Sequence, residues 1–224
     1  MKLHLWLYRL ENKISKIAIE KLMSLLTVAM AIVWVMDILI SLSGYEISIY
    51  GLLYFDRGLI FSGQVWRIIT FLFLYPTASN YLFIALALYF YWWLGSSLES
   101  YMGKARFNLY YLFGVIGSII AGLIVGGMTN VYLNLSLFLA FAVLFPEMKV
   151  LLFFFIPVKI KWLGLLDGAL LLFSFITGSW RVRAAILAAM ASFLLFFGPR
   201  LWYDIKRWHT EYKYRKNNNN NYYG

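Results

Sequence analysis

The stretch GQVWRIITFLFLYP, residues 63–76, places an arginine beside a tryptophan at the start of an apolar run. An arginine next to hydrocarbon is costly unless its N–H donors are satisfied. We therefore expect Arg67 to donate to loop carbonyls and to a carboxylate, and Trp66 to sit at a membrane interface. The pair would then fix a loop against a helix bundle. The alternative is a plain interfacial anchor.

The rest of the chain supports a membrane setting. Of its 224 residues, 62% are hydrophobic and only 13% are charged, whereas a soluble domain is about a quarter charged. The composition predicts an all-α polytopic membrane protein, since a membrane helix needs ~20 apolar residues. The chain has no cysteine, which excludes disulfides and thiolate sites. Its histidines, His4 and His209, lie near the ends, so we expect no metal and no cofactor.

Hydropathy divides the chain into three parts. Residues 1–21 are expected to form an interfacial amphipathic segment, 22–199 a six-helix membrane domain, and 200–224 a basic, Asn-rich cytoplasmic tail whose asparagine run is disordered. Six spans are predicted, the last of them closed by Gly198 and Pro199, and a short helical or loop element at 65–75 precedes the second span. The expected spans are 22–42, 81–98, 107–126, 131–145, 162–177 and 184–197.

Positive charge predicts the orientation of these spans. Lys and Arg residues concentrate in alternate connections, and only four of the 20, Arg57, Arg67, Arg181 and Arg183, fall in the opposite set. Loops rich in Lys and Arg stay cytoplasmic, so both termini are predicted inside and the connection at 43–63 outside. This bias accounts for the net charge of +10 without a nucleic-acid partner. The tail is expected to contact membrane lipids or a cytosolic partner.

Several motifs follow one another in a recognisable order. After GQVWR come Gly95, Glu99, Gly103 and Arg106 within LGSSLESYMGKARF, and later the string FAVLFPEMKVLLFFFIPVKIKW. The chain resembles the rhomboid superfamily over residues 48–198. The resemblance implies a six-span rhomboid-like helical bundle with an outer loop between spans one and two. We expect Glu99 and Arg106 to tie span two to span three, with two solvated loop charges as the alternative.

The residues of rhomboid proteases can be sought in this chain. The family's serine lies in a Gly-x-Ser-Gly motif at the start of span four, with a histidine base in span six and an oxyanion-binding histidine and asparagine in span two. The matching positions hold Val131, Ile186, Phe83 and Ala87. Ser136 lacks flanking glycines, and no histidine separates His4 from His209. The resemblance therefore implies no enzyme but a pseudoprotease similar to the derlins, which keep the Trp-Arg pair.

Small residues suggest how the bundle packs. Gly114, Ser118, Gly122 and Gly126 recur every fourth residue in span three, and small faces let membrane helices approach closely. Ala184, Ala188 and Ser192 share that spacing in span six. We expect these two faces to dock.

Two acids lie inside predicted spans. Asp37 is in span one and Asp167 in span five, and an ionisable residue at such depth is a functional candidate, with a hydrogen-bonded structural role as the alternative. The function predicted is binding of client transmembrane helices in membrane-protein quality control, chaperoning or dislocation. The entrance is expected beside spans two and five, where Pro76 and Asp167 disturb packing. Alternatives are an intramembrane protease with unrecognised catalytic residues and a proton-coupled small-solute transporter.

Overall fold

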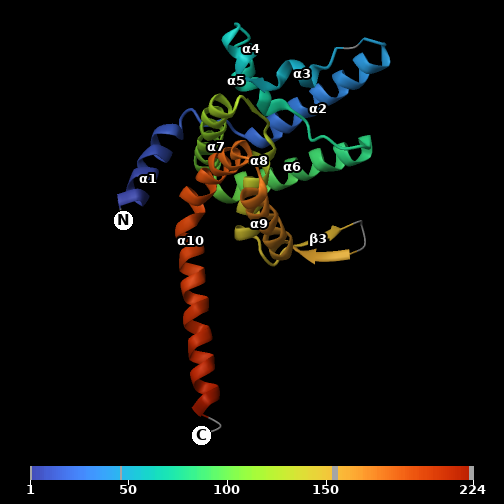
Figure 1. The fold of residues 1–224 in the computed structure, drawn as a ribbon. Helices are drawn as coiled ribbons and strands as arrows, with labels where there is room; N and C mark the ends of the chain where they lie inside the picture. The colour runs from blue at the N-terminus through green and yellow to red at the C-terminus, as the bar shows by residue number, and fades with distance from the viewer. Residues whose placement is uncertain (1, 46, 153–155, 222–224) are drawn as a thin grey trace.

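Helices make up most of the chain (Figure 1). The computed structural model describes residues 2–45, 47–152 and 156–221. The helices are α1 (Lys2–Ile14), α2 (Leu22–Leu42), α3 (Ile49–Leu53), α4 (Arg57–Phe61), α5 (Arg67–Thr70), η1 (Phe71–Phe73), α6 (Tyr81–Met102), α7 (Lys104–Val125), α8 (Val131–Leu144), α9 (Ile160–Thr177) and α10 (Trp180–Asn221). Two antiparallel pairs complete the fold: β1 (Phe55–Asp56) with β2 (Gly127–Met128), and β3 (Lys149–Leu152) with β4 (Ile156–Lys159).

Among the described residues, five helices are long and apolar enough to cross a membrane. They are α2, α6, α7, α9 and the segment Trp180–Tyr203 of α10, while α8 is apolar but shorter, with 14 residues. Apolar side chains on α2 face outward, Leu25 and Val28 among them, as they do where lipid replaces water. The prediction of an all-α polytopic membrane protein is confirmed, as is its location as a multi-pass integral protein.

The core lies where α7, α8 and α10 meet. Tyr110, Phe107 and Phe141 are among its largest fully buried side chains, and the Tyr110 ring packs edge-to-face on Phe196 and Phe197 of α10. The apolar α8 buries residues on all sides, which is typical of a helix enclosed by others.

Two sequence predictions about the last helix are wrong. We expected Gly198 and Pro199 to close it and the asparagine run to be disordered, yet α10 continues through Pro199 to Asn221 (Figure 1). A proline inside a helix removes one backbone hydrogen bond but need not end the helix. Extending an existing helix also avoids the unfavourable nucleation step, so the membrane segment can support a polar continuation.

A β-hairpin stands between α8 and α9, in the connection between the predicted fourth and fifth spans, where no strand was expected. Lys149 pairs with Lys159, and the register continues to Leu152 and Ile156. Glu147 closes the base, because its carboxylate accepts from Lys159 Nζ at 2.7 Å and from Lys161 Nζ at 2.6 Å. These two lysines lower the pKa of Glu147 to about 2. The hairpin projects from the bundle in Figure 1.

Candidate functional site

Arg67 is buried at the start of α5 and holds the preceding loop. Its NH1 donates to the carbonyls of Gly51 and Tyr54, both at 2.7 Å, and its Nε donates to Gln64 Oε1 at 2.8 Å. Only 3% of the residue is exposed. The loop carbonyls were expected, but the carboxylate was not found: a side-chain amide takes its place. Its hydrogen-bond partners are therefore all neutral acceptors.

Trp66 completes this contact from the surface. Its ring is half exposed, and its Nε1 lies 3.4 Å from the carbonyl of Leu52. An aromatic ring with one polar contact and an exposed apolar face is typical of a membrane interface. The Trp-Arg pair thus contacts three carbonyls of one short segment, residues 51–54.

Asp37 is fully engaged in hydrogen bonds. Its Oδ1 accepts from the backbone N–H of Ile49 at 2.7 Å, and its Oδ2 accepts from the Tyr75 hydroxyl at 2.6 Å. Burial, and then this bond to Asp37, raise the pKa of the Tyr75 phenol above its ordinary value. Both carboxylate oxygens of Asp37 thus accept a hydrogen bond, an arrangement that fits the structural alternative.

Glu99 and Arg106 do not tie α6 to α7 as expected. Glu99 is buried, and its two carboxylate oxygens accept from the backbone N–H groups of Leu22 and Met23 at 3.0 and 3.3 Å. Arg106 instead lies 3.5 Å from Glu11 of α1. The first turn of a helix leaves N–H groups unpaired and carries partial positive charge, so a carboxylate from α6 stabilises the start of α2.

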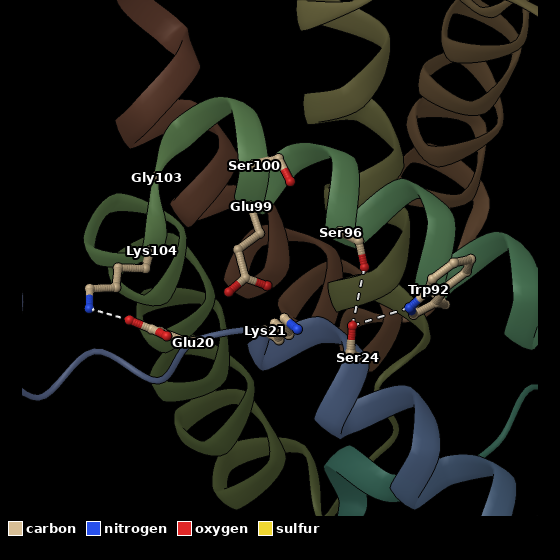
Figure 2. Close-up of a pocket in the computed structure, with 9 residues that line it drawn as sticks. All are labelled: Glu20, Lys21, Ser24, Trp92, Ser96, Glu99, Ser100, Gly103 and Lys104. Atoms are coloured by element: carbon tan, nitrogen blue, oxygen red, sulfur yellow. Dashed lines mark hydrogen bonds and ion pairs between the residues drawn. The ribbon is translucent and has the colours of Figure 1, made fainter.

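A cavity of about 570 Å³ lies beside this contact. Figure 2 shows Glu99 reaching from α6 toward the start of α2, with Ser24 close to Ser96 and Trp92. Lys104 forms an ion pair with Glu20 at 2.7 Å. Lys21, at the junction, takes a left-handed backbone conformation with φ 54°. The cavity therefore lies at the edge of the contact between α2 and α6, and polar contacts bridge its rim.

The positions that match rhomboid catalytic residues hold apolar side chains. Phe83 on α6 and Val131 at the start of α8 are exposed, Ala87 is half-buried, and Ile186 on α10 is buried. Ser136 is 1% exposed and donates to the carbonyl of Leu133 at 2.8 Å. The Tyr110 hydroxyl lies against the same serine, 3.2 Å from its Oγ. The serine proton is thus bound to a backbone carbonyl.

The small-residue face of α7 divides between several neighbours. A Cβ on Gly114 would lie 2.7 Å from Leu133 and 3.3 Å from Ser192, whereas one on Gly122 would meet the ring of Phe55. Ser118 is buried, and Gly126 ends the helix with φ 102°. Among the glycines of α7, Gly117 lies against the backbone of α10: a Cβ there would lie 2.7 Å from the carbonyl oxygen of Ala188. The two helices pack together, but one face of α7 alone does not make the contact.

The strongest candidate site is an apolar cavity lined by α6, α8 and α9. It measures about 340 Å³, and apolar side chains from all three helices line it. Three polar side chains line it: Tyr91 and Asp167, near the middle of α6 and α9, and Asn134, in the first turn of α8. The Asn134 amide also interacts with the Tyr91 hydroxyl.

Two acceptors in this cavity have no partner among the described residues. Asn134 Oδ1 and Asp167 Oδ2 are buried and make no hydrogen bond, and Asn134 is only 4% exposed. An unpaired polar group costs several kcal/mol in surroundings that lack water. We define this set, Tyr91, Asn134 and Asp167 with their apolar surroundings, as the acceptor groove.

Sequence reasoning found one member of the acceptor groove and missed two. Asp167 was a candidate because it is charged within a span. Asn134 and Tyr91 also lie within apolar runs, and polarity at that depth was the signal that could have identified Asn134. No protein-family model matches the chain, and no curated protein matches it. The acceptor groove is therefore interpreted from its own geometry.

Proposed function

We propose that the protein is a catalytically inactive, rhomboid-like membrane protein of six spans, with α8 as the short fourth span and both termini cytoplasmic. In this proposal it binds transmembrane helices of client proteins through the acceptor groove. The role is in membrane-protein quality control, as a chaperone or as part of a dislocation machinery. The observation that carries the proposal is the pair of unpartnered acceptors, Asn134 Oδ1 and Asp167 Oδ2, in one apolar groove.

The chemistry of the groove favours a helix that carries a hydrogen-bond donor. Its apolar side chains, Phe90, Phe138 and Leu170 among them, can contact a client's aliphatic side chains. The two acceptors can receive donors such as an Asn amide or a Lys ammonium. A misassembled membrane protein exposes such donors to lipid, where they lack partners. The groove would therefore select orphan helices over correctly assembled ones.

The length of α8 supports the same role. Its 14 residues span roughly 21 Å at ~1.5 Å per residue, less than the ~30 Å of bilayer hydrocarbon. Where the exposed start of α8 at Val131 meets lipid, a short span thins the bilayer. A thinner bilayer lowers the cost of moving a helix with polar residues to the groove or out of the membrane.

The absence of a protease dyad in the sequence supports an inactive protein. No histidine occurs between His4 and His209, and the one serine near the expected position, Ser136, is buried with its proton donated to Leu133. Serine needs an adjacent base to act as a nucleophile.

A pair of model clients tests helix binding directly. One client is a single-span polyleucine helix with a central Asn, and the other has Leu at that position. With a photo-reactive amino acid at Leu170, which is exposed beside the groove, we expect the Asn client to be crosslinked several-fold more than the Leu client. The matched control carries the probe at Ile120 of α7, equally exposed but outside the groove, where both clients should react alike.

A double variant tests whether the two acceptors cause the preference for the Asn client. Asn134→Leu with Asp167→Leu should abolish the preference for the Asn client. The same change should leave unfolding in detergent unchanged or raise its midpoint, because it removes unpaired buried polar groups. Equal capture of both clients by the wild type would refute the proposal. Cleavage of a rhomboid substrate that is lost on Ser136→Ala, or proton-linked solute uptake lost on Asp37→Asn, would establish the protease or the transporter in its place.

A further inference from the structure

A second pocket, separate from both the acceptor groove and the cavity of Figure 2, lies where the ends of four helices meet. It encloses about 440 Å³ and is lined by Tyr101 of α6, Arg106 of α7, and Phe196, Phe197, Arg200 and Tyr203 of α10, with α8 contributing from the fourth side. A volume of this size is within the range of small-ligand sites. These helix ends belong to the side that the charge pattern predicts to be cytoplasmic.

The charge of this pocket is unbalanced. The cavity of Figure 2 is lined by two acids and two lysines, and there Lys104 pairs with Glu20 while Glu99 binds the start of α2. The second pocket is lined by Arg106 and Arg200, and no acidic side chain among those that the structure describes lines it.

Neither arginine is saturated by the described residues. Arg106 has only its Nε within 4 Å of Glu11, at 3.5 Å, and in the described part of the chain Arg200 makes no hydrogen bond or ion pair. Two planar guanidinium groups therefore offer free N–H donors to one cavity. Guanidinium groups bind phosphate oxygens in a bidentate way, and the hydroxyls of Tyr101 and Tyr203 can add donors.

The walls indicate a lipid and not a soluble anion. Phe196 and Phe197 form an apolar, buried wall, which suits acyl chains beneath a head group. Trp202 and Tyr203 follow on α10 with 72% and 65% of their surface exposed, as aromatic residues do at the level of lipid head groups. Basic pockets between membrane helices on the cytoplasmic side bind anionic head groups.

We infer that this pocket holds the phosphate of an anionic phospholipid from the cytoplasmic leaflet. Arg106 of α7 and Arg200 of α10 donate hydrogen bonds to the phosphate. Phe196 and Phe197 contact the part of the acyl chain nearest the head group. The bound lipid joins the first turn of α7 to the point where α10 leaves the bundle.

The test uses the full chain in nanodiscs of phosphatidylcholine with a small fraction of phosphatidylglycerol. Native mass spectrometry counts the phosphatidylglycerol that stays bound after release and measures its Kd. We expect Arg200→Gln to raise that Kd ~tenfold, which corresponds to ~1.4 kcal/mol. The matched control is Lys206→Gln, which removes one positive charge from an exposed side chain of the same helix outside the pocket. It should shift the Kd by no more than about twofold, since diffuse attraction to a surface depends weakly on one charge.

Two outcomes would overturn the inference. Equal effects of Arg200→Gln and Lys206→Gln would mean that the lipid is held by the general charge of the tail. Displacement of phosphatidylglycerol by an equal concentration of free glycerol phosphate would mean that the pocket takes a soluble anion. Arg200 has no partner within the described chain, so its substitution should leave the unfolding midpoint unchanged, and that midpoint is measured alongside.

Discussion

At the scale of single residues, Arg67 and Asp37 hold the two ends of the same short helix. Asp37 accepts from the N–H of Ile49 at the start of α3, and Arg67 donates to the carbonyls of Gly51 and Tyr54 near its end. N–H groups are unpaired at the start of a helix and carbonyls at its end, so each charge matches the polarity of the groups it meets. Such a small helix would not form on its own. These two residues position it.

Substitution of Arg67 should therefore release α3. Arg67→Ala removes three hydrogen bonds from a charged donor, and we expect it to lower the free energy of unfolding by about 2–3 kcal/mol, because bonds to charged groups contribute ~1.5–3 kcal/mol each before water replaces some of them. Arg181→Ala is the control, since Arg181 is an exposed arginine on the same predicted side. Arg57 would be a poor control because it donates to the carbonyl of Leu123 at the end of α7. Thermal unfolding in detergent measures both, and equal shifts would contradict the assignment.

The contact between Tyr75 and Asp37 predicts a response to alkaline pH. Burial and the hydrogen bond to Asp37 raise the pKa of Tyr75 above its ordinary value of 10.0, so the folded state favours the neutral phenol. The contribution of this residue to stability is full below pH ~10 and is lost as pH rises toward the folded pKa. Unfolding midpoints measured at rising alkaline pH should fall more for the wild type than for Tyr75→Phe. Parallel curves would show that the phenol does not contribute.

How far single residues could be predicted depended on their chemistry. The buried arginine at position 67 and its carbonyl partners were predictable because a guanidinium next to an apolar run has few alternatives. The partner of Glu99 was not, because the carboxylate acts on backbone N–H groups of α2, at a sequence separation of 77 residues. Backbone donors look the same at every position of a sequence.

At the scale of helices, boundaries were more predictable than contacts. The apolar run at 22–42 matches α2, and Val131 opens both the predicted fourth span and α8. Contacts require the rotation of each helix about its axis, which a spacing of four residues does not supply. Gly114 and Gly122 lie on one face of α7, yet one meets Leu133 and Ser192 and the other meets Phe55. The hairpin of β3 and β4 was missed because its continuous apolar residues do not show the alternation of polar and apolar side chains that marks an exposed strand.

The tight contact between α7 and α10 can be tested with one methyl group. Gly117→Ala places a Cβ 2.7 Å from the backbone oxygen of Ala188, so the helices must separate. Overpacking of this kind costs ~1–3 kcal/mol. Gly198→Ala on α10 is the control, because no atom lies within 4 Å of its added Cβ and alanine favours a helix by up to ~1 kcal/mol. We expect a lower unfolding midpoint for the first variant and an unchanged or higher one for the second. A neutral Gly117→Ala would contradict the close approach.

At the scale of the whole molecule, composition and charge predicted the class of protein and a direction of insertion. The class of protein depends on hydrophobic and charged content summed over the whole chain, and a single sequence gives these totals directly. The path of α10 beyond Pro199 could not be predicted, because a proline and a run of asparagines usually mark a helix end and a disordered segment. The structure shows that the helix passes Pro199 without a break and continues to Asn221.

The predicted orientation can be tested in a chain that has no cysteine of its own. Single cysteines at Ser62, after α4, and at Asn218, in the tail, should react with a membrane-impermeant thiol reagent from opposite sides. Ser62→Cys should be labelled from outside in intact cells, and Asn218→Cys only after permeabilisation. The predicted map puts an odd number of membrane crossings between the two positions. Labelling of both from the same side would mean an even number, and α8 would then be a buried helix that does not cross the membrane.

The unbroken α10 has a mechanical consequence. Beyond the membrane segment Trp180–Tyr203 it continues to Asn221 for another 18 residues, or roughly 27 Å at ~1.5 Å per residue. A helix of this length is stiff, so a tilt of the membrane segment by about 10° displaces its far end by roughly 5 Å relative to Tyr203.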